Sequence, residues 1–242
     1  MSDFKFPTEE VQLPSKGLLY PKDSPLSSGK VELKYMTAKE EDILTNQSYI
    51  QKGTVLDKLL QSLIVDKDIK IDDLYVGDKN ALFIAARILG YGKDYEVTIL
   101  GVKEKIDLSQ IEAKNIDYKA LEDANNSFTY KLESTGTVLG FKLLNGHDEK
   151  KVQKELDGLK KINPGFTPAL TTRLKYMITS VDGKDEKKDI RDFVDNYFLA
   201  RDSRAFREHV RSISPDMDLT VQLDSGEEVT VPIGLTFFWP DA

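Results

Sequence analysis

The sequence predicts an α+β fold of two similar lobes, each made of a short strand, helices and a terminal β-hairpin, which arose by internal duplication. Three observations predict this fold. Residues 31–35 alternate apolar and polar side chains, as a half-buried strand does. Apolar side chains recur at helical spacing across residues 55–64. Two strand-like segments flank Ser225-Gly226, a dipeptide typical of a hairpin turn.

The first 111 residues divide into an arm and a lobe. Residues 1–30 contain four prolines among apolar side chains, so we expect an extended apolar arm there. Residues 31–111 form the N-terminal α+β lobe, in which Thr37 and Glu40 make a capping box that begins a helix. The other elements expected in this lobe are a helix over 55–64, a helix from Asp78 to Gly90, and strands over 95–99 and 105–108.

The remaining residues divide into a linker and a second lobe. Residues 112–127 are polar and poorly periodic, so we expect a linker. Residues 128–242 form the C-terminal α+β lobe, which ends in an aromatic tail. The elements expected there are strands over 128–132 and 138–144, a helix that begins near His147 with Asn145 as its cap, a helix over 169–181, a helix marked by residues 190–198, a helix that begins at Asp202, and a hairpin over 219–233.

An ordered set of matches relates the two lobes. Residues 31–41 align without gaps to residues 139–149, and both segments read as a strand, a capping residue and an acidic first helical turn. Residues 63–64 match 177–178, residues 65–66 match 181–182, and residues 78–82 match 202–206. These matches favour a duplication. The alternative is chance similarity between two short strand–helix units.

Composition and charge exclude several classes of function. The chain has 242 residues and a net charge of −7, which opposes broad binding to a phosphate backbone, so we expect no nucleic-acid partner. No apolar run is long enough to span a membrane, and residues 1–10 lack the apolar centre of a signal peptide. We therefore expect synthesis in the cytoplasm and no membrane partner.

The residues that usually carry chemistry are sparse. The absence of cysteine excludes thiolate nucleophiles and cysteine-bound metals, and the two histidines, His147 and His209, lie far apart in the chain. No phosphate-binding glycine loop or nucleophile elbow occurs. Adjacent acidic pairs such as Asp72 and Asp73 point apart, so they do not converge on a substrate. We expect no catalytic residue, no cofactor, no metal and no enzymatic activity.

Three segments are candidates for contact with another protein. The apolar arm and the aromatic tail must be buried somewhere, either on this chain or on a partner. Arg201 and Arg204 stand in a charge-dense segment, which is either a helix start with local ion pairs or a clamp for carboxylates of a partner. The candidate partner-binding residues are Leu13, Pro14, Leu18, Leu19, Tyr20, Arg201, Arg204, Phe237, Phe238, Trp239 and Pro240.

Several short motifs resemble the baseplate hub and tail-assembly protein family of tailed bacteriophages with contractile, T-even type tails. The motifs cover residues 13–21, 33–37 with 40–42, 77–82, 141–144 with 148–149, 200–204 and 237–240. Some members of that family carry a cysteine pair near the hairpin after the third helix, which suggests a zinc ribbon. Residues 97–108 of this chain contain no cysteine, so the resemblance carries no metal site over to it.

The resemblance implies a late, structural protein of virion assembly that acts in the central hub of the viral baseplate. Its partners would be other baseplate hub or tail proteins, and it could oligomerise within the assembly. It would lie in the host-cell cytoplasm during assembly, and in the tail baseplate if the virion retains it. The alternative is a transient assembly chaperone for a hub subunit, absent from the mature virion. A hub-associated hydrolase is a third reading, but it lacks an identifiable nucleophile or a convergent pair of acids.

Overall fold

Strand β1 (Thr8–Gln12) begins the first half of the molecule and pairs antiparallel with β2 (Lys30–Lys34). The computed structural model describes residues 7–99, 102–122, 124–223 and 226–238. Between β1 and β2 the chain makes a compact loop in which Gly17 has a φ of 80°. A Cβ atom at Gly17 would lie 2.4 Å from the carbonyl oxygen of Ser27, so only glycine fits this close approach. Most of the expected arm is thus part of the folded first half.

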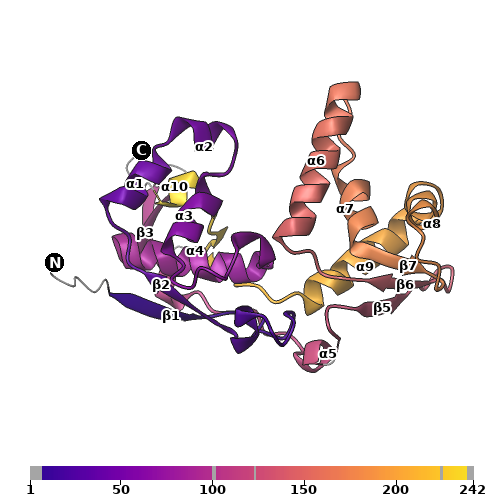
Figure 1. Ribbon diagram of the computed structural model, residues 1–242, viewed down its shortest axis with the longest axis horizontal. Coiled ribbons are helices and arrows are strands. Elements are labelled where there is room, and N and C mark those ends of the chain that lie inside the picture. Colours follow the sequence, from indigo (N-terminus) through magenta and orange to yellow (C-terminus); the bar gives the residue numbers. More distant parts are fainter. Residues whose placement is uncertain (1–6, 100–101, 123, 224–225, 239–242) are drawn as a thin grey trace.

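Four α-helices and a hairpin complete the first half (Figure 1). Thr37 caps α1, and the Glu40 carboxylate accepts hydrogen bonds from the Thr37 backbone amide and hydroxyl. Helix α4 ends at Gly92, which has a φ of 84°. The elements are α1 (Ala38–Leu44), α2 (Gln47–Gln51), α3 (Val55–Leu63), α4 (Val76–Tyr91), β3 (Asp94–Ile99) and β4 (Val102–Asp107), with 3-10 turns η1 (Pro25–Ser28), η2 (Ile71–Asp73) and η3 (Leu108–Gln110).

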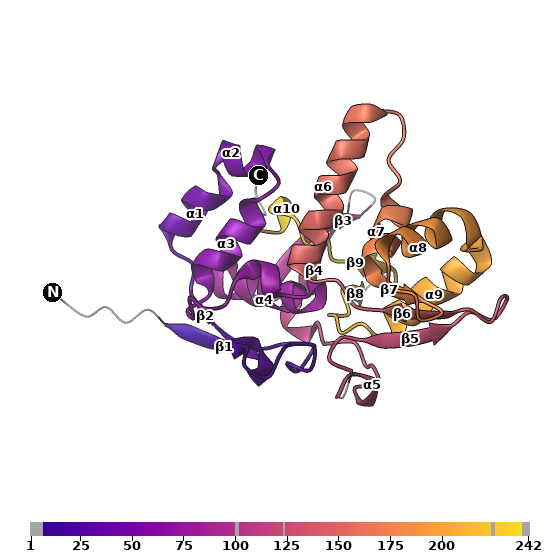
Figure 2. The same ribbon diagram turned by 45° about the vertical axis from the view of Figure 1, so that its right-hand side comes forward.

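The second half is built on a three-stranded antiparallel sheet of order β5-β6-β7. Helix α6 projects away from this sheet (Figures 1 and 2). The expected helix from Ala169 is shorter than predicted, because residues 178–181 extend and pair with β6. The elements are α5 (Lys119–Glu122), β5 (Phe128–Lys131), β6 (Val138–Phe141), α6 (Gly146–Ile162), α7 (Ala169–Met177), β7 (Ile178–Val181), α8 (Lys187–Asp192), the π-helical turn η4 (Phe193–Tyr197) and α9 (Ala200–Ile213).

The C-terminal segment returns to the first half. The chain leaves α9 at Pro215, and Asp216 accepts a backbone hydrogen bond from Lys114. It then forms the hairpin β8 (Thr220–Gln222) and β9 (Glu228–Thr230) and the short helix α10 (Leu235–Phe238). Helix α10 packs on α4. The sequence placed the aromatic tail with the C-terminal lobe, but these contacts place its described part on the first half.

The fold is a mixed α+β structure with small sheets, so the α+β part of the predicted fold class is confirmed. Each half also contains a β-bridge between positions that the sequence alignment matches. Leu33 of β2 makes an antiparallel bridge to Ile64, directly after α3. Phe141 of β6 pairs antiparallel with Ile178, directly after α7. The sequence alignment matches Leu33 to Phe141 and Ile64 to Ile178.

A lysine–carboxylate pair also occupies matching positions in the two halves. Lys34 Nζ lies 2.7 Å from Glu40 Oε1, and Lys142 Nζ lies 2.7 Å from Asp148 Oδ2. In each half the pair joins the end of a strand to the first turn of the helix that follows it. The helix start is stabilised both by this pair and by the acidic charge near its N-terminus.

A buried aspartate near the start of α4 and of α9 faces a serine of the loop after β1 and after β5. Asp78 accepts hydrogen bonds from Ser15 N at 2.9 Å, Ser15 Oγ at 2.7 Å and Tyr20 Oη at 2.6 Å. Asp202 accepts one hydrogen bond, from Ser134 N at 3.4 Å, and its Oδ2 has no partner among the described residues. Burial raises the pKa of the Asp78 carboxyl, although the donors from Tyr20 and Ser15 act against that rise.

Candidate functional site

The residues of the expected apolar arm pack within this chain. Leu13, Pro14, Leu19 and Tyr20 are buried, and Leu18 is partly buried against the same core. The Tyr20 ring meets the ring of Tyr75 edge to face at a centroid distance of 5.2 Å. In this conformation these side chains pack within the first half, and Leu19 also borders the cavity described below.

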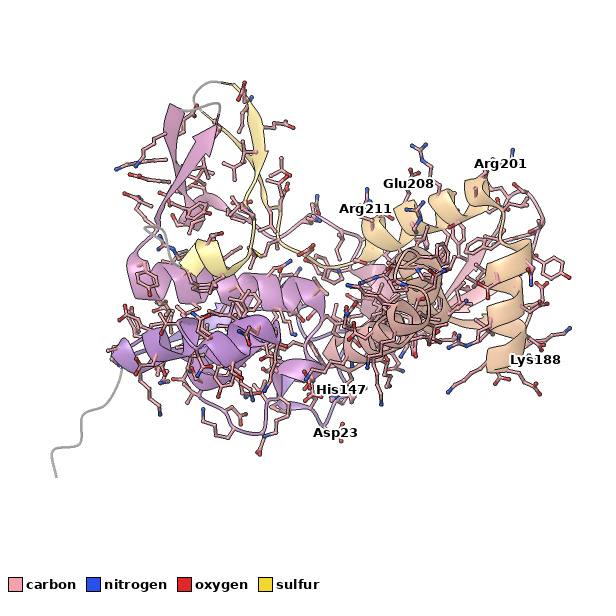
Figure 3. The ribbon with its side chains drawn as sticks, turned by 90° about the horizontal axis from the view of Figure 1, so that it is seen from above. Asp23, His147, Lys188, Arg201, Glu208 and Arg211 are labelled. Atoms are coloured by element: carbon pink, nitrogen blue, oxygen red, sulfur yellow. The ribbon has the colours of Figure 1, made fainter. Side chains whose placement is uncertain are left out.

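The two arginines expected as a clamp lie in the first turns of α9, and Figure 3 shows Arg201 at the outer end of this helix. Arg201 donates to the hydroxyl of Ser134, and Arg204 Nε lies 2.9 Å from Glu208 Oε1. Both arginines remain exposed, and the Arg204–Glu208 pair has the spacing of one helical turn. The local contacts are those of the first alternative, a helix start with its own ion pair.

The described part of the aromatic tail is buried. Phe237 and Phe238 have no exposed surface, and their rings contact Tyr95 and Phe83 respectively. Arg87 Nε donates to the main-chain oxygen of Phe237 at 2.9 Å. Trp239 and Pro240, which the sequence also proposed as partner contacts, lie outside the described residues.

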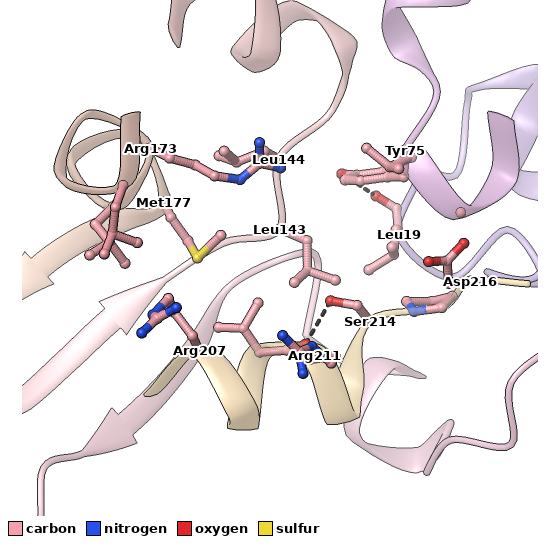
Figure 4. Close-up of a pocket in the computed structure, with 16 residues that line it drawn as sticks. Leu19, Tyr75, Leu143, Leu144, Arg173, Met177, Arg207, Arg211, Ser214 and Asp216 are labelled. Atoms are coloured by element: carbon pink, nitrogen blue, oxygen red, sulfur yellow. Dashed lines mark hydrogen bonds between the residues drawn. The ribbon is translucent and has the colours of Figure 1, made fainter. Parts of the chain in front are cut away.

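A cavity of about 310 Å³ lies where the two halves meet (Figure 4). Helices α7 and α9 form two of its sides, and the start of α4 with Leu19 closes it from the first half. Its lining is mainly apolar and includes Leu143, Leu144 and Met177. Two lining side chains are large, apolar and exposed, because Val76 is 45% and Leu170 is 46% solvent-accessible. Exposed apolar side chains that line a cavity are a common feature of binding sites.

Three arginines give this apolar cavity its charge. Arg173 comes from α7, and Arg207 and Arg211 come from α9 (Figure 4). Arg173 is already paired, because both of its terminal nitrogens donate to the carboxylate of Glu149. Burial raises the pKa of the Glu149 carboxyl even though Arg173 acts to lower it.

The other two arginines have no carboxylate partner among the described residues. Arg207 Nε donates only to the Ser203 main-chain oxygen, 3.2 Å away and one turn earlier in α9. Arg211 makes no hydrogen bond or ion pair with the described chain, and both side chains are exposed. The nearby Asp216 is held by Lys114 and Asn80. Two guanidinium groups are thus free to bind an incoming carboxylate.

The hydroxyl groups of the cavity are committed to the fold. The Tyr75 hydroxyl donates to the Leu19 main-chain oxygen and accepts from Asn126, and burial raises its pKa to about 12. Ser214 Oγ donates to the Val210 main-chain oxygen. What the site offers is therefore apolar surface and cationic donors, which suit binding of an apolar group that carries a carboxylate.

Neither histidine lies in the cavity. His147 Nε2 lies 2.9 Å from Asp73 Oδ1 on the surface. His209 stacks on Tyr130 at a centroid distance of 4.7 Å, and burial lowers its pKa. Among the described residues, no three acidic or histidine side chains are grouped so that they could hold a metal ion.

Sequence reasoning missed the cavity and its two unpaired arginines. Arg207 and Arg211 are one helical turn apart, so their spacing alone places them on the same face of α9. The position of that face opposite α7 and the start of α4 depends on contacts between distant parts of the chain, which no local pattern reveals. In the part of the chain that the structure covers, no helix is both long and apolar enough to cross a membrane. Comparisons with protein-family models, with curated proteins and with solved structures find no match.

Proposed function

We propose that the chain is a component or assembly factor of the central hub of a contractile-tail baseplate and acts through protein–protein contacts. The motif resemblance gives the biological setting of this proposal. The cavity between the halves is the observation that carries it, because its apolar walls and unpaired arginines offer a surface for another protein. We also propose that the chain binds without catalysing a reaction.

The chemistry of the cavity supports binding in preference to turnover. Its hydroxyls donate to main-chain oxygens, so none is held by a base in the way that a nucleophile must be. Its arginines are cationic donors that cannot accept a proton at neutral pH. Leu170 and Val76 expose apolar surface at the rim, and such side chains frequently contribute to protein interfaces.

Co-expression with candidate hub and tail proteins encoded in the same genome tests this proposal. We expect one of them to form a stoichiometric complex with the purified chain, as measured by size-exclusion chromatography with light scattering. Leu170→Glu should weaken that complex, since it puts a charge on the cavity wall. Ile162→Glu is the matched control, because Ile162 is exposed at the end of α6 and does not line the cavity. A chain that binds none of these proteins would contradict the proposal.

A retained hub subunit and a transient chaperone differ in where the chain ends up. Mass spectrometry of purified virions and of assembly intermediates from infected cells separates them. Presence in the virion supports the component, and presence in intermediates alone supports the chaperone.

We further propose that the two halves arose by internal duplication. The matching Leu33–Ile64 and Phe141–Ile178 bridges support this, as do the matching lysine–carboxylate pairs. The loop serines that face Asp78 and Asp202 add a third correspondence, which the sequence alignment did not include. Superposition of residues 8–91 on residues 128–213 tests the idea, and helices that fail to overlap would contradict it.

A further inference from the structure

Two positions on α4 match two positions on α9, but only the positions on α4 are covered by another segment of the chain. When Asp78 is matched to Asp202, Phe83 corresponds to Arg207 and Arg87 corresponds to Arg211. In both helices the two positions are four residues apart, so they share one face. The α4 pair is buried, whereas the α9 pair is exposed.

On α4, the face that carries Phe83 and Arg87 binds the short helix α10. The ring of Phe83 contacts the ring of Phe238 at a centroid distance of 6.0 Å. Arg87 donates to the main-chain oxygen of Phe237, and this arginine is only 2% exposed. A short aromatic segment from a distant part of the chain, α10, is thus bound across this face by one aromatic contact and one arginine hydrogen bond.

The corresponding face of α9 opens into the cavity between the halves, which no described segment fills. We propose that it binds a short segment of a partner protein that combines a large apolar side chain with carboxylates. The inference rests on the proposed function, since it names the chemistry of the partner at the same cavity. The apolar side chain would enter between Leu143, Leu174 and Val210, and the carboxylates would meet Arg207 and Arg211.

The charges of the site select this occupant. Arg207 of α9 stands at the position that matches Phe83 of α4, so the α9 face carries a cation where the α4 face carries an aromatic ring. Guanidinium groups pair with carboxylates through two parallel hydrogen bonds, which favours an acidic segment. A nucleic acid would be repelled by a chain of net charge −7, and a small free anion would leave the apolar walls uncovered. A second copy of this chain is the other protein occupant that the experiment must separate.

The test measures binding of labelled peptides to the full chain by fluorescence polarisation. The first peptide carries two phenylalanines flanked by glutamates, the second replaces the phenylalanines with alanine, and the third replaces the glutamates with lysine. We expect the first to bind most tightly. Arg207→Glu/Arg211→Glu should weaken it by about tenfold or more, because two charge-assisted contacts become repulsive.

The matched control is Lys187→Glu/Lys188→Glu, which makes the same change in net charge on α8. Lys188 is on the far side of the second half, away from the cavity (Figure 3). The control should bind the first peptide as the wild-type chain does. The cavity variant should in turn bind the lysine peptide more tightly than the wild-type chain does, a gain that an unfolded variant would not give.

Several results would overturn the inference. One is equal affinity of the wild-type chain for the acidic and the basic aromatic peptide. Others are the same loss of affinity in the Lys187→Glu/Lys188→Glu control, or a loss of affinity in Arg201→Glu/Arg204→Glu but not in Arg207→Glu/Arg211→Glu. Binding of inorganic phosphate at the cavity without any peptide would also do so. Self-association of the chain that Arg207→Glu/Arg211→Glu abolishes would assign the cavity to a second copy and also overturn it. If the chain forms a complex with a hub or tail protein that the cavity variant leaves intact, this inference fails and the proposed function stands. If the acidic peptide binds but no hub or tail protein does, the proposed function fails instead.

Discussion

Helices α4 and α9 begin alike but end with different surroundings. Each carries a buried aspartate in its first turn that faces a loop serine, and each packs a large apolar side chain, Leu82 or Phe206, into the core. Helix α4 is then covered on a further face by α10, whereas the same face of α9 borders the cavity. The difference teaches that the same face of a helix becomes buried core or stays exposed according to whether a distant segment returns to cover it.

The two aspartates show the same contrast at the level of hydrogen bonds. Asp78 accepts three, because the longer loop between β1 and β2 supplies Tyr20 as well as Ser15. The shorter loop between β5 and β6 supplies Ser134 alone, and one oxygen of Asp202 stays without a partner in the described structure. The buried aspartate of the first half is therefore the more fully satisfied of the two, and we expect it to be the less tolerant of substitution.

Phe237→Ala has the largest expected effect, because it removes a buried ring from the segment that covers α4. Phe237 is fully buried against Tyr95, and truncation of a buried aromatic ring costs about 3–5 kcal/mol of unfolding free energy. Chemical denaturation monitored by circular dichroism measures that loss. Phe166→Ala is the control, because Phe166 is 62% exposed and should change stability by less than about 0.5 kcal/mol. Equal stability of the two variants would show that α10 does not cover α4 in solution.

Asp78→Ala should cost about 3 kcal/mol, since it leaves the buried donors of Ser15 and Tyr20 without an acceptor. Asp202→Ala should cost about 1 kcal/mol, because it removes a single long hydrogen bond. Urea denaturation of both variants tests the comparison. Costs in the reverse order would contradict the contrast between the two halves.

The sequence predicted the elements whose signals are local. The capping box of Thr37 and Glu40, the helical spacing over 55–64 and the final hairpin all occur as expected. Local signals failed where a segment could form either a helix or a strand. Residues 178–181 continue the apolar pattern of α7, but they extend as β7 because pairing with β6 satisfies their backbone groups.

Contacts between distant segments were not predictable from one sequence. The large apolar side chains of the aromatic tail indicated that it is buried, but the sequence did not indicate which surface buries it. Its described part lies on α4, which belongs to the other half of the chain. The cavity also depends on contacts between distant segments, since its walls come from residues as far apart as Leu19 and Asp216. Arg207 and Arg211 therefore look like ordinary surface arginines until the fold places them on a cavity wall.

Arg87→Ala and Arg211→Ala compare matching positions directly. Arg87 is buried and donates to the main-chain oxygens of Phe237 and Gly92, so its loss should cost about 2 kcal/mol. Arg211 is exposed and makes no contact of this kind in the described chain, so its loss should change stability by less than about 0.5 kcal/mol. Thermal unfolding at one protein concentration measures both. A large loss from Arg211→Ala would mean that its role is structural and would weaken the case for a binding cavity.

A smaller effect than that of Phe237, Asp78 or Arg87 is expected at Glu40, where stability depends on pH. Burial alone would raise the pKa of this carboxyl, but hydrogen bonds from Lys34 and Thr37 outweigh burial and hold the pKa at about 2. This folded-state pKa is below the ordinary value of 4.5 for a glutamate carboxyl. The stabilisation is therefore present above pH 4.5 and is lost as the pH falls toward about 2.

Glu40→Gln isolates this contribution because it keeps the shape of the side chain and removes its charge. The partly exposed Lys34 is screened by solvent, so we expect the variant to lose only about 1–2 kcal/mol at neutral pH. The gap between wild type and variant should close as the pH approaches 2, since Glu40 of the wild type is then protonated too. Urea denaturation across this pH range measures the gap. A gap that stays constant would mean that packing around Glu40, and not its charge, stabilises the start of α1.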